Sequence, residues 1–397
     1  MSASLSLVYH SVAPWTAAVK EPATWLAIFA CAAWVYLIAF RGGFWRSLPV
    51  LDRDTPSGRA GVAVIVPARN EAESIARSLR SLLQQDYPGH CAVVLVDDNS
   101  TDGTGDIAVS LGGGSRLHLV RGAPLPAGWS GKLWAVHQGL AHPAAASADY
   151  VLLTDADIEH APGHISTLVA AAERGRLDLV SEMVHLRCET IAERALIPAF
   201  IFFFQMLYPF AWVADPGRRT AGAAGGTILL SRATLDHVQG VSRIRARLID
   251  DCALAHEIKR SGGRIWLGHT TCAVSARAYS GWRDVWQMIA RTAYEQLGYS
   301  PVFLLGCVLG MSAIFLAPPL LTLFSAGLPR LLGLAAWIIM ALSFQPTLCR
   351  YQRSPFWGVA LPAISLFYMG ATAASAARHS CGRGGQWKGR VYPRDND

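Results

Sequence analysis

The sequence predicts an α/β domain with a mostly parallel sheet, set between apolar segments long enough to cross a membrane. Short apolar runs alternate with helical patterns between residues 61 and 300, which is typical of parallel strands joined by right-handed crossovers. Uncharged apolar runs lie on both sides of this region. Hydrophobic residues make up 52% of the 397 residues and charged residues only 16%, against about 25% in typical soluble domains.

Three parts follow from this pattern. Residues 1–60 contain a membrane anchor at about 23–40, residues 61–300 form the α/β domain, and residues 301–397 contain further membrane helices and a basic tail. Arginines follow the anchor, so the positive-inside rule places residue 41 onward in the cytoplasm. The position of these charges and the length of the run argue against a cleaved signal peptide.

The C-terminal part contains three apolar segments, at roughly 302–325, 331–348 and 356–377. Together with the anchor they give four spans, which place the tail outside the cytoplasm. The positive-inside rule opposes this, because the tail carries five basic residues: Arg378, Arg383, Lys388, Arg390 and Arg394. A re-entrant segment broken at Pro318-Pro319 is one solution.

Charge and cysteine usage exclude two classes of protein. The net charge is +7, but the lysines and arginines are scattered and form no aromatic-basic array, so we expect no nucleic-acid partner. The charge suits a membrane surface and a diphosphate. The eight cysteines form no Cys-x-x-Cys pair and lie mostly in apolar surroundings, which indicates a reducing compartment and neither a disulfide framework nor a zinc site.

Two carboxylates end the central predicted strand. Residues 151–153 read as a buried strand, and Asp155 and Asp157 follow it one residue apart. Ligands of open α/β sheets bind at the carboxyl ends of strands. Close carboxylates repel each other unless a cation is present, and Mg²⁺ or Mn²⁺ prefers oxygen ligands and substrate phosphates. Asp155 and Asp157 are therefore candidate metal ligands, with an ordinary surface turn as the alternative.

Polar residues also follow the neighbouring predicted strands. The strand at 62–66 leads into Pro67-Ala68-Arg69-Asn70-Glu71, and the strand at 91–96 leads into Asp97-Asp98. After a further strand at 117–120, a glycine-rich loop ends in Lys132. Asp98 can accept a hydrogen bond from a nucleobase, Lys132 can reach a diphosphate, and Asp155 can hold ribose as well as metal.

A fifth acidic segment lies further along the chain. A helix opens at Asp250-Asp251 and ends near Ser261-Gly262-Gly263. Asp251 lies where free helix amides favour a carboxylate, so capping is one interpretation and acid–base chemistry the other. A transferase with a nucleoside diphosphate donor needs this whole set, because a metal neutralises the leaving diphosphate and a base deprotonates the attacking hydroxyl.

The apolar run at 195–214 interrupts this region. Hydropathy alone predicts a span, but a single crossing would separate Asp155 from Asp250 and Asp251. Two prolines and the aromatic residues of the run favour an interfacial helix in the headgroup layer. A buried core helix is the alternative.

These segments resemble family 2 glycosyltransferases, which have the Rossmann-like GT-A fold. The resemblance covers about Val62 to Gly298 and rests on Val-Ile-Val-Pro-Ala-Arg-Asn-Glu, Val-Asp-Asp-Asn-Ser-Thr-Asp-Gly-Thr, Thr-Asp-Ala-Asp and Asp-Asp-Cys-Ala-Leu-Ala. Within the family, residues 128–135 and 387–392 look like the hopene-associated glycosyltransferases of bacterial hopanoid loci. Carotenoid glycosyltransferases and ceramide glucosyltransferases are similar.

The resemblance implies an inverting, metal-dependent transfer from a nucleotide sugar, with UDP as the expected nucleotide. The implied acceptor is a membrane lipid hydroxyl, with a hopanoid as the candidate, on the cytoplasmic face of a bacterial inner membrane. It also implies that Asp251 is the catalytic base and that Asp250 helps hold the loop. The nucleotide sugar would be bound by Pro67, Ala68, Arg69, Asn70, Glu71, Asp98, Lys132 and Asp155.

One family motif is absent. Many relatives carry Gln-x-x-Arg-Trp on the helix after the base, but residues 291–299 lack it, which argues against processive polymer synthesis. Arg291, Lys388 and Arg390 are candidates for the missing charge. Two alternative functions stay open: a processive polysaccharide synthase that conducts its product, and a non-enzymatic nucleotide-sugar-binding membrane protein. The intact acidic positions count against the second.

Overall fold

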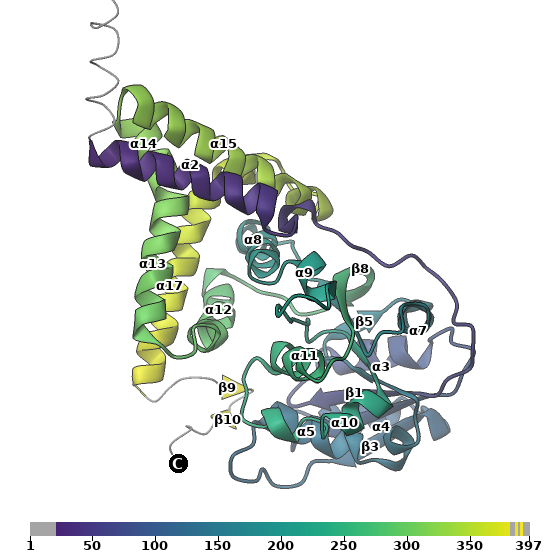
Figure 1. Ribbon diagram of the computed structural model, residues 1–397. Coiled ribbons are helices and arrows are strands. Elements are labelled where there is room, and N and C mark those ends of the chain that lie inside the picture. The colour runs from purple at the N-terminus through teal and green to yellow at the C-terminus, as the bar shows by residue number, and fades with distance from the viewer. Residues whose placement is uncertain (1–20, 382–385, 388–389, 392–397) are drawn as a thin grey trace, which may run out of the picture. The chain divides into compact units, whose positions relative to one another are not determined.

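The computed structural model describes residues 21–381, 386–387 and 390–391 (Figure 1). The chain divides into two compact units, each assembled from segments far apart in the sequence. The sheet unit contains residues 48–190, 207–281 and those from 378 onward, and the helical unit contains residues up to 47, 191–206 and 282–377.

The sheet unit is built on an eight-stranded mixed sheet. Strands β1 to β4 pair in parallel, as do β6 and β8, while β7 pairs antiparallel with β4 and β6, and β5 pairs antiparallel with β8. The predicted mostly parallel sheet is confirmed. In the order of pairing, the strands are β3 (Leu117–Arg121), β2 (Cys91–Asp97), β1 (Val62–Ala68), β4 (Tyr150–Leu153), β7 (Ile228–Ser231), β6 (Leu179–His185), β8 (Ile265–Ser275) and β5 (Ile158–His160).

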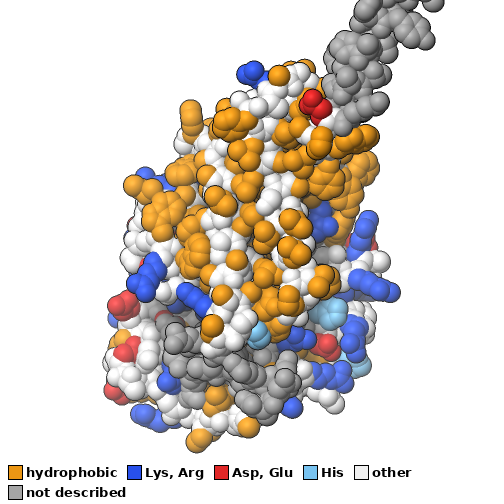
Figure 2. Space-filling view, turned by 90° about the vertical axis from the view of Figure 1, so that its left-hand side faces the viewer, with side chains coloured by type: hydrophobic (Ala, Val, Ile, Leu, Met, Phe, Trp, Pro, Cys, Tyr) orange, Lys and Arg blue, Asp and Glu red, His pale blue; other side chains and the backbone are white. Residues whose placement is uncertain are grey.

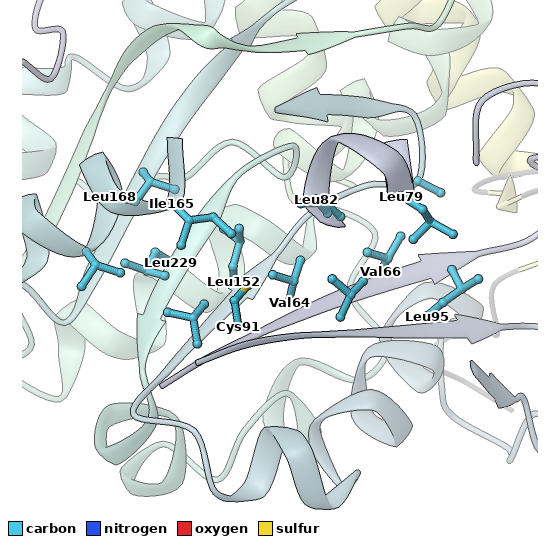
Figure 3. Packing of buried hydrophobic residues seen from close by; sticks show 14 of the residues in the cluster. Val64, Val66, Leu79, Leu82, Cys91, Leu95, Leu152, Ile165, Leu168 and Leu229 are labelled. Carbon is cyan, nitrogen blue, oxygen red and sulfur yellow. The ribbon is translucent and has the colours of Figure 1, made fainter. Parts of the chain in front are cut away.

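Continuous apolar runs form the central strands because both faces of the sheet are covered. Every residue of β1 and β2 is buried. Side chains on one face pack against α3 (Ile75–Leu83) and α7 (His164–Gly175), and Figure 3 shows this cluster. Helix α5 (Gly131–Leu140) contacts β1 and β2 on the other face, where a Cβ at Gly139 would lie 2.5 Å from Ile65 Cγ2. Only glycine permits this approach of the helix.

The parallel register brings the predicted loops to one edge of the sheet. Val62 of β1 pairs with Cys91 of β2 and with Tyr150 of β4, so the three carboxyl ends lie side by side. Helix α11 begins at Asp250 and ends before Gly262, whose φ of +91° suits a glycine stop, as predicted. The remaining elements of the unit are α4 (Thr104–Ser110), η2 (Gly114–Arg116), α6 (Pro143–Ala146), α9 (Phe210–Ala214), α10 (Arg232–His237), η3 (Ser242–Ile244), β9 (Gln386–Trp387) and β10 (Arg390–Val391).

The helical unit contains the predicted membrane segments. Helix α2 packs against α14 and α15. Of the tail's basic residues, Arg383, Lys388 and Arg394 lie outside the described residues. The elements are α2 (Pro22–Phe40), η1 (Phe44–Arg46), α8 (Ile191–Leu207), α12 (Trp282–Gln296), α13 (Pro301–Met311), η4 (Ser312–Leu316), α14 (Ala317–Phe324), α15 (Gly327–Arg350), α16 (Phe356–Val359) and α17 (Leu361–Ser380).

Pro318 and Pro319 widen a helix and do not break it. Prolines lack the N–H that would bond the carbonyl four residues earlier, so the helix passes through the π-helical turn η4 just before them. The carbonyl of Ile314, which Pro318 cannot bond, accepts the indole N–H of Trp34 at 2.6 Å. The Trp34 ring also packs edge-on against Phe315, with ring centroids 5.3 Å apart. An aromatic side chain of α2 therefore satisfies the freed backbone group.

Three described helices are long and apolar enough to cross a membrane: Pro22–Phe40, Pro301–Phe324 and Gly327–Arg350. Large hydrophobic side chains are exposed along all three, and Figure 2 shows how densely they cover the helical unit. The fourth segment expected from the sequence forms α16 and α17, and neither helix is both long and apolar enough to be a candidate span. Its buried residues include Ser365 and Ser375, and Arg378 lies in its last turn, so α17 is a packed and more polar helix.

The run at 195–214 is not one helix. Helix α8 ends at Leu207 and α9 starts at Phe210, because Pro209 has no N–H and disfavours helical geometry at Tyr208. Most side chains of α8 are buried, and Phe203 packs against Phe315 and Tyr368 within the helical unit. The run is therefore no single span, and its place in a membrane interface stays a prediction.

Candidate active site

One ammonium group joins two of the predicted acidic loops. Lys132 lies in the first turn of α5, which Ser130 caps by accepting the amide of Leu133 at 3.3 Å. Its Nζ lies 3.0 Å from Asp155 Oδ1 and 3.2 Å from Asp250 Oδ2. Burial alone would lower the pKa of Lys132, but the nearby carboxylates raise it above its ordinary value. The strand-end loop and the start of α11 are therefore tied together by a permanently charged lysine.

Asp251 faces two backbone amides. Its Oδ1 accepts from the Cys252 amide at 2.7 Å and its Oδ2 from the Gly225 amide at 2.8 Å. The first contact lies within the opening turn of α11, and the second holds a separate loop. Burial, and then the charge of Asp250, raise the pKa of Asp251 to about 6, against the lowering effects of Lys132 and the two amides. Asp251 is thus a carboxylate poised to exchange a proton near neutral pH.

Gly225 leaves little room beside this contact. A Cβ at position 225 would lie 3.3 Å from Asp251 Oδ2 and 3.4 Å from Lys132 Nζ, which is tighter than most real contacts. The loop around it is buried at Ala223 and Ala224, and the Ala224 amide donates to Ser181 Oγ at 2.8 Å. The loop is therefore packed, and it holds the Asp251 carboxylate.

Asp157 lies in different surroundings. Its Oδ2 accepts from the Ser275 hydroxyl at 3.2 Å, and its backbone carbonyl accepts the Ala276 amide. Burial, and then the charge of Asp155, raise the pKa of Asp157 to about 6, while Arg277 lowers it. Asp157 is less exposed than the sequence suggested, and Arg277 is a nearby cation that sequence reasoning did not identify.

The loops after β1 and β2 interlock. The Asn70 amide donates to Ser100 Oγ at 3.0 Å, and Asn70 Oδ1 accepts the Thr101 amide at 2.9 Å. Asn70 has a φ of +52°, a left-handed conformation that asparagine tolerates well. Arg69 lies over buried Asp98, with 3.7 Å between Nη1 and Oδ2. Arg69 and Asn70 therefore join the loop after β1 to the loop after β2.

A cavity lies against the Lys132 cluster. Its polar lining includes Lys132, Thr154, Asp155, Asp250 and Asp251. Among the other lining residues are Pro67, Leu133, Val136, Gly225, Val241, Ile244 and Leu254. The cavity therefore joins the predicted base, the lysine and one predicted metal ligand.

The acidic set fits a metal that binds together with its substrate. In the part of the chain that the structure describes, no group of three His, Cys, Asp or Glu side chains could hold an ion by itself. Asp155 and Asp157 supply two carboxylates, and mutual repulsion helps raise the pKa of Asp157. Mg²⁺ and Mn²⁺ commonly take one or two carboxylates and complete their coordination with phosphate and water. The residues fit such an ion.

Comparison with known proteins agrees with this geometry. Residues 63–236 match the profile of Glycosyl transferase family 2. This segment is similar to family 2 glycosyltransferase domains. It contains the loops after β1, β2 and β4 and Lys132, whereas Asp250 and Asp251 lie beyond its end.

Two curated relatives share part of the domain. The chain is 33% identical over 98 residues to a 4,4'-diaponeurosporenoate glycosyltransferase of Staphylococcus haemolyticus, which is 25% of this chain and 24% of that protein. It is 35% identical over 97 residues to the enzyme of the same name from Staphylococcus aureus, which is 24% of each. The match thus spans about a quarter of the length of these relatives.

A solved structure resembles the chain over most of its length. The mannosyltransferase PcManGT from Pyrobaculum calidifontis, solved in complex with GDP-Man and Mn²⁺, superposes with a TM-score of 0.56 and 22% identity. The match covers 90% of this chain and 99% of that one. The predicted GT-A fold is confirmed, and profile, relatives and fold together support a glycosyltransferase.

Proposed function

We propose that this protein is a membrane glycosyltransferase that moves a sugar from a nucleotide sugar to a lipid hydroxyl. The observation that carries the proposal is the Lys132 cluster. One partly buried ammonium binds Asp155 beside the predicted metal site and Asp250 beside Asp251, and all four residues line one cavity. A sugar-nucleotide transferase needs a cation for the leaving diphosphate and a base for the acceptor within this distance.

The chain's own residues support an inverting displacement. The acceptor hydroxyl gives its proton to the Asp251 carboxylate as its oxygen forms a bond to the anomeric carbon. The bond from that carbon to the diphosphate oxygen breaks, and the nucleoside diphosphate leaves with the electron pair. Lys132 offers its charge to this leaving group, and the buried Asp98, under Arg69, offers a carboxylate to the nucleobase.

A divalent ion held by Asp155 and Asp157 would neutralise charge on the diphosphate. Arg277 lies close enough to Asp157 to lower its pKa, and so helps keep this carboxylate ionised. The sequence resemblance favours UDP as the nucleotide, while PcManGT was solved with GDP-Man. Both donors therefore belong in the assay.

The membrane helices support a lipid acceptor and a cytoplasmic domain. If the three candidate helices each cross the membrane, residue 41 and the end of α17 would lie on the same side, and the positive-inside rule favours the cytoplasm for the arginines after α2. A three-span topology would agree with the positive-inside rule, which four spans opposed. The curated relatives are named for a lipid-related substrate, and hopanoid is the acceptor that the sequence resemblance suggests.

The deciding experiment combines an assay with lipid profiling. Membranes that contain the wild type should release UDP or GDP from a nucleotide sugar when lipid extract is added, and Asp251→Asn membranes should not. Deletion of the gene should remove one glycolipid from the mass spectrum of extracted lipids. A polymeric product would favour a polysaccharide synthase, and donor binding without any transfer would favour a non-enzymatic protein.

A further inference from the structure

A line of four buried side chains runs beneath the end of β4. Thr154 Oγ1 lies 2.9 Å from His160 Nε2, His160 Nδ1 lies 2.8 Å from His164 Nδ1, and His164 Nε2 lies 2.5 Å from Glu182 Oε2. Each of the four residues is at most 4% exposed. They come from the exit of β4, from β5, from α7 and from β6, and we call them the buried chain.

The available donors and acceptors fix the direction of the hydrogen bonds in the buried chain. The Thr154 hydroxyl donates to the Gly226 carbonyl at 2.8 Å, so Oγ1 must accept from His160 Nε2. Burial, and then the neighbouring His164, hold the pKa of His160 well below its ordinary value, so this ring is neutral and its Nδ1 has no proton. His164 Nδ1 must therefore donate to it, and His164 Nε2 and Glu182 share a single proton.

Thr154, at one end of the buried chain, lies between the two acidic loops. Thr154 immediately precedes Asp155, and its bond partner Gly226 immediately follows Gly225, whose amide holds Asp251. Gly226 packs closely against β6, because a Cβ added there would lie 2.8 Å from Val184 Cγ1. A single hydroxyl thus joins the loop of the predicted metal ligands to the loop that holds the predicted base.

We propose that the buried chain is a positioning device: Glu182, His164 and His160 hold the Thr154 hydroxyl on Gly226 and thereby fix Asp155 relative to Asp251. This inference rests on the proposed transfer reaction, because it assigns roles relative to its two acidic groups. Burying ionisable groups is costly, and a hydrophobic set of the same volume is often as stable. The chain therefore contributes orientation, which a hydrophobic core at this place would not supply.

Paired variants test the direction of the chain. Glu182→Gln keeps it, because a glutamine amide can donate to His164 Nε2, whereas Glu182→Leu leaves this nitrogen without a partner. Thr154→Ser keeps the hydroxyl, and Thr154→Val removes it with little change in shape. We expect Thr154→Val and Glu182→Leu to lower kcat about 10- to 100-fold, with a smaller effect on donor affinity, and the conservative partners to restore it.

A second readout does not depend on transfer. The Gly225 amide donates to Asp251, so its nuclear magnetic resonance signal should titrate with the carboxylate, near pH 6. Thr154→Val and Glu182→Leu should shift this titration, and Thr154→Ser and Glu182→Gln should not. Leu168→Ala, a buried change in α7 outside the chain, is the control for lost stability and should leave both kcat and the titration unchanged.

The outcomes separate the two proposals. If the wild type transfers no sugar while the Gly225 signal still follows the variants as expected, the proposed function is wrong and the positioning role holds. If Thr154→Val and Glu182→Leu leave both the signal and the turnover of an active enzyme unchanged, the positioning role is wrong. It is equally wrong if Leu168→Ala, matched for thermal stability, reduces kcat and shifts the titration as much as they do.

Discussion

The site contains two acidic pairs, Asp155 with Asp157 and Asp250 with Asp251, which share a pattern but differ in their surroundings. In each pair one carboxylate binds Lys132: Asp155 at 3.0 Å and Asp250 at 3.2 Å. In each pair burial is the main reason that the pKa of the other carboxylate, Asp157 or Asp251, rises to about 6. Sequence spacing alone therefore cannot tell a metal ligand from a base.

The difference lies in what each buried carboxylate touches. Asp157 has a hydroxyl and a guanidinium nearby, and the charge of Asp155 repels it. Asp251 has two backbone amides, which fix its orientation without a formal positive charge. A divalent ion would relieve the repulsion at Asp157, whereas Asp251 keeps lone pairs that can take a proton. The comparison supports the proposed metal binding by Asp155 and Asp157 and the proposed proton transfer by Asp251.

Asp157→Ala should have the largest effect. Removing one of only two candidate ligands should reduce transfer to the background rate, as should excess EDTA with the wild type. Nucleotide release from membranes measures both, with Mn²⁺ added back as a control and thermal unfolding to show that the variant is folded. Full turnover of this variant, or of the wild type in EDTA, would contradict the proposed metal site at Asp155 and Asp157.

Asp251→Asn should lower kcat by ~10²–10⁴, the usual contribution of a general base. The amide can still accept both backbone N–H groups, so the fold and metal-dependent donor binding should stay close to wild type. Titration with the nucleotide sugar measures binding beside turnover. Normal turnover would leave Asp251 with a purely structural role and make Asp250 the next candidate for the base.

Lys132→Met should affect both pairs at once. Lys132 lowers the pKa of Asp251, and Asp250 raises it. The variant should therefore move the acidic limb of the kcat/KM profile to higher pH. On this limb, transfer falls about tenfold for each unit by which the pH is lowered. Adding Asp250→Asn should move this limb back toward wild type, as a double-mutant cycle. An acidic limb that Lys132→Met leaves unchanged would contradict the influence of Lys132 on the pKa of Asp251.

The smallest effect concerns stability. The pKa of Asp251 is raised from 3.8 in a free carboxyl to about 6, so the folded state takes up a proton more readily than the unfolded state. Its contribution to stability is fully present below about pH 4 and is lost as the pH rises through 6. Wild type should therefore lose stability relative to Asp251→Asn across this range in thermal melts. A constant difference would contradict the burial of Asp251.

The sequence predicted those parts of the fold whose signals are local. Strands β1, β2 and β4 and helix α3 followed from apolar periodicity, and the glycines after α11 marked its end. The polar loops at one sheet edge followed from the parallel pattern. Strand β8 was missed because Gly-His-Thr-Thr interrupts its apolar run, and β5 because it has only three residues.

The rest of the site depends on contacts between distant segments. No local pattern relates His164 to Glu182 or Arg277 to Asp157, because folding of the sheet brings them together. Lys132 was predicted to reach a diphosphate, and its bonds to Asp155 and Asp250 were not foreseen. The roles of the named site residues stay predictions for the variants above to test.

The bond from Trp34 to the Ile314 carbonyl also has a consequence for biogenesis. The two residues lie 280 positions apart, so at ~5–20 residues per second roughly 14–56 s of translation separate them. Nearly all of the sheet unit is synthesised in this interval, while α2 has neither α14 nor α15 to pack against. Helix α2 therefore completes its packing only after most of the chain has been translated, and a nascent chain stalled before Ile314 would lack both of the helices, α14 and α15, that α2 packs against.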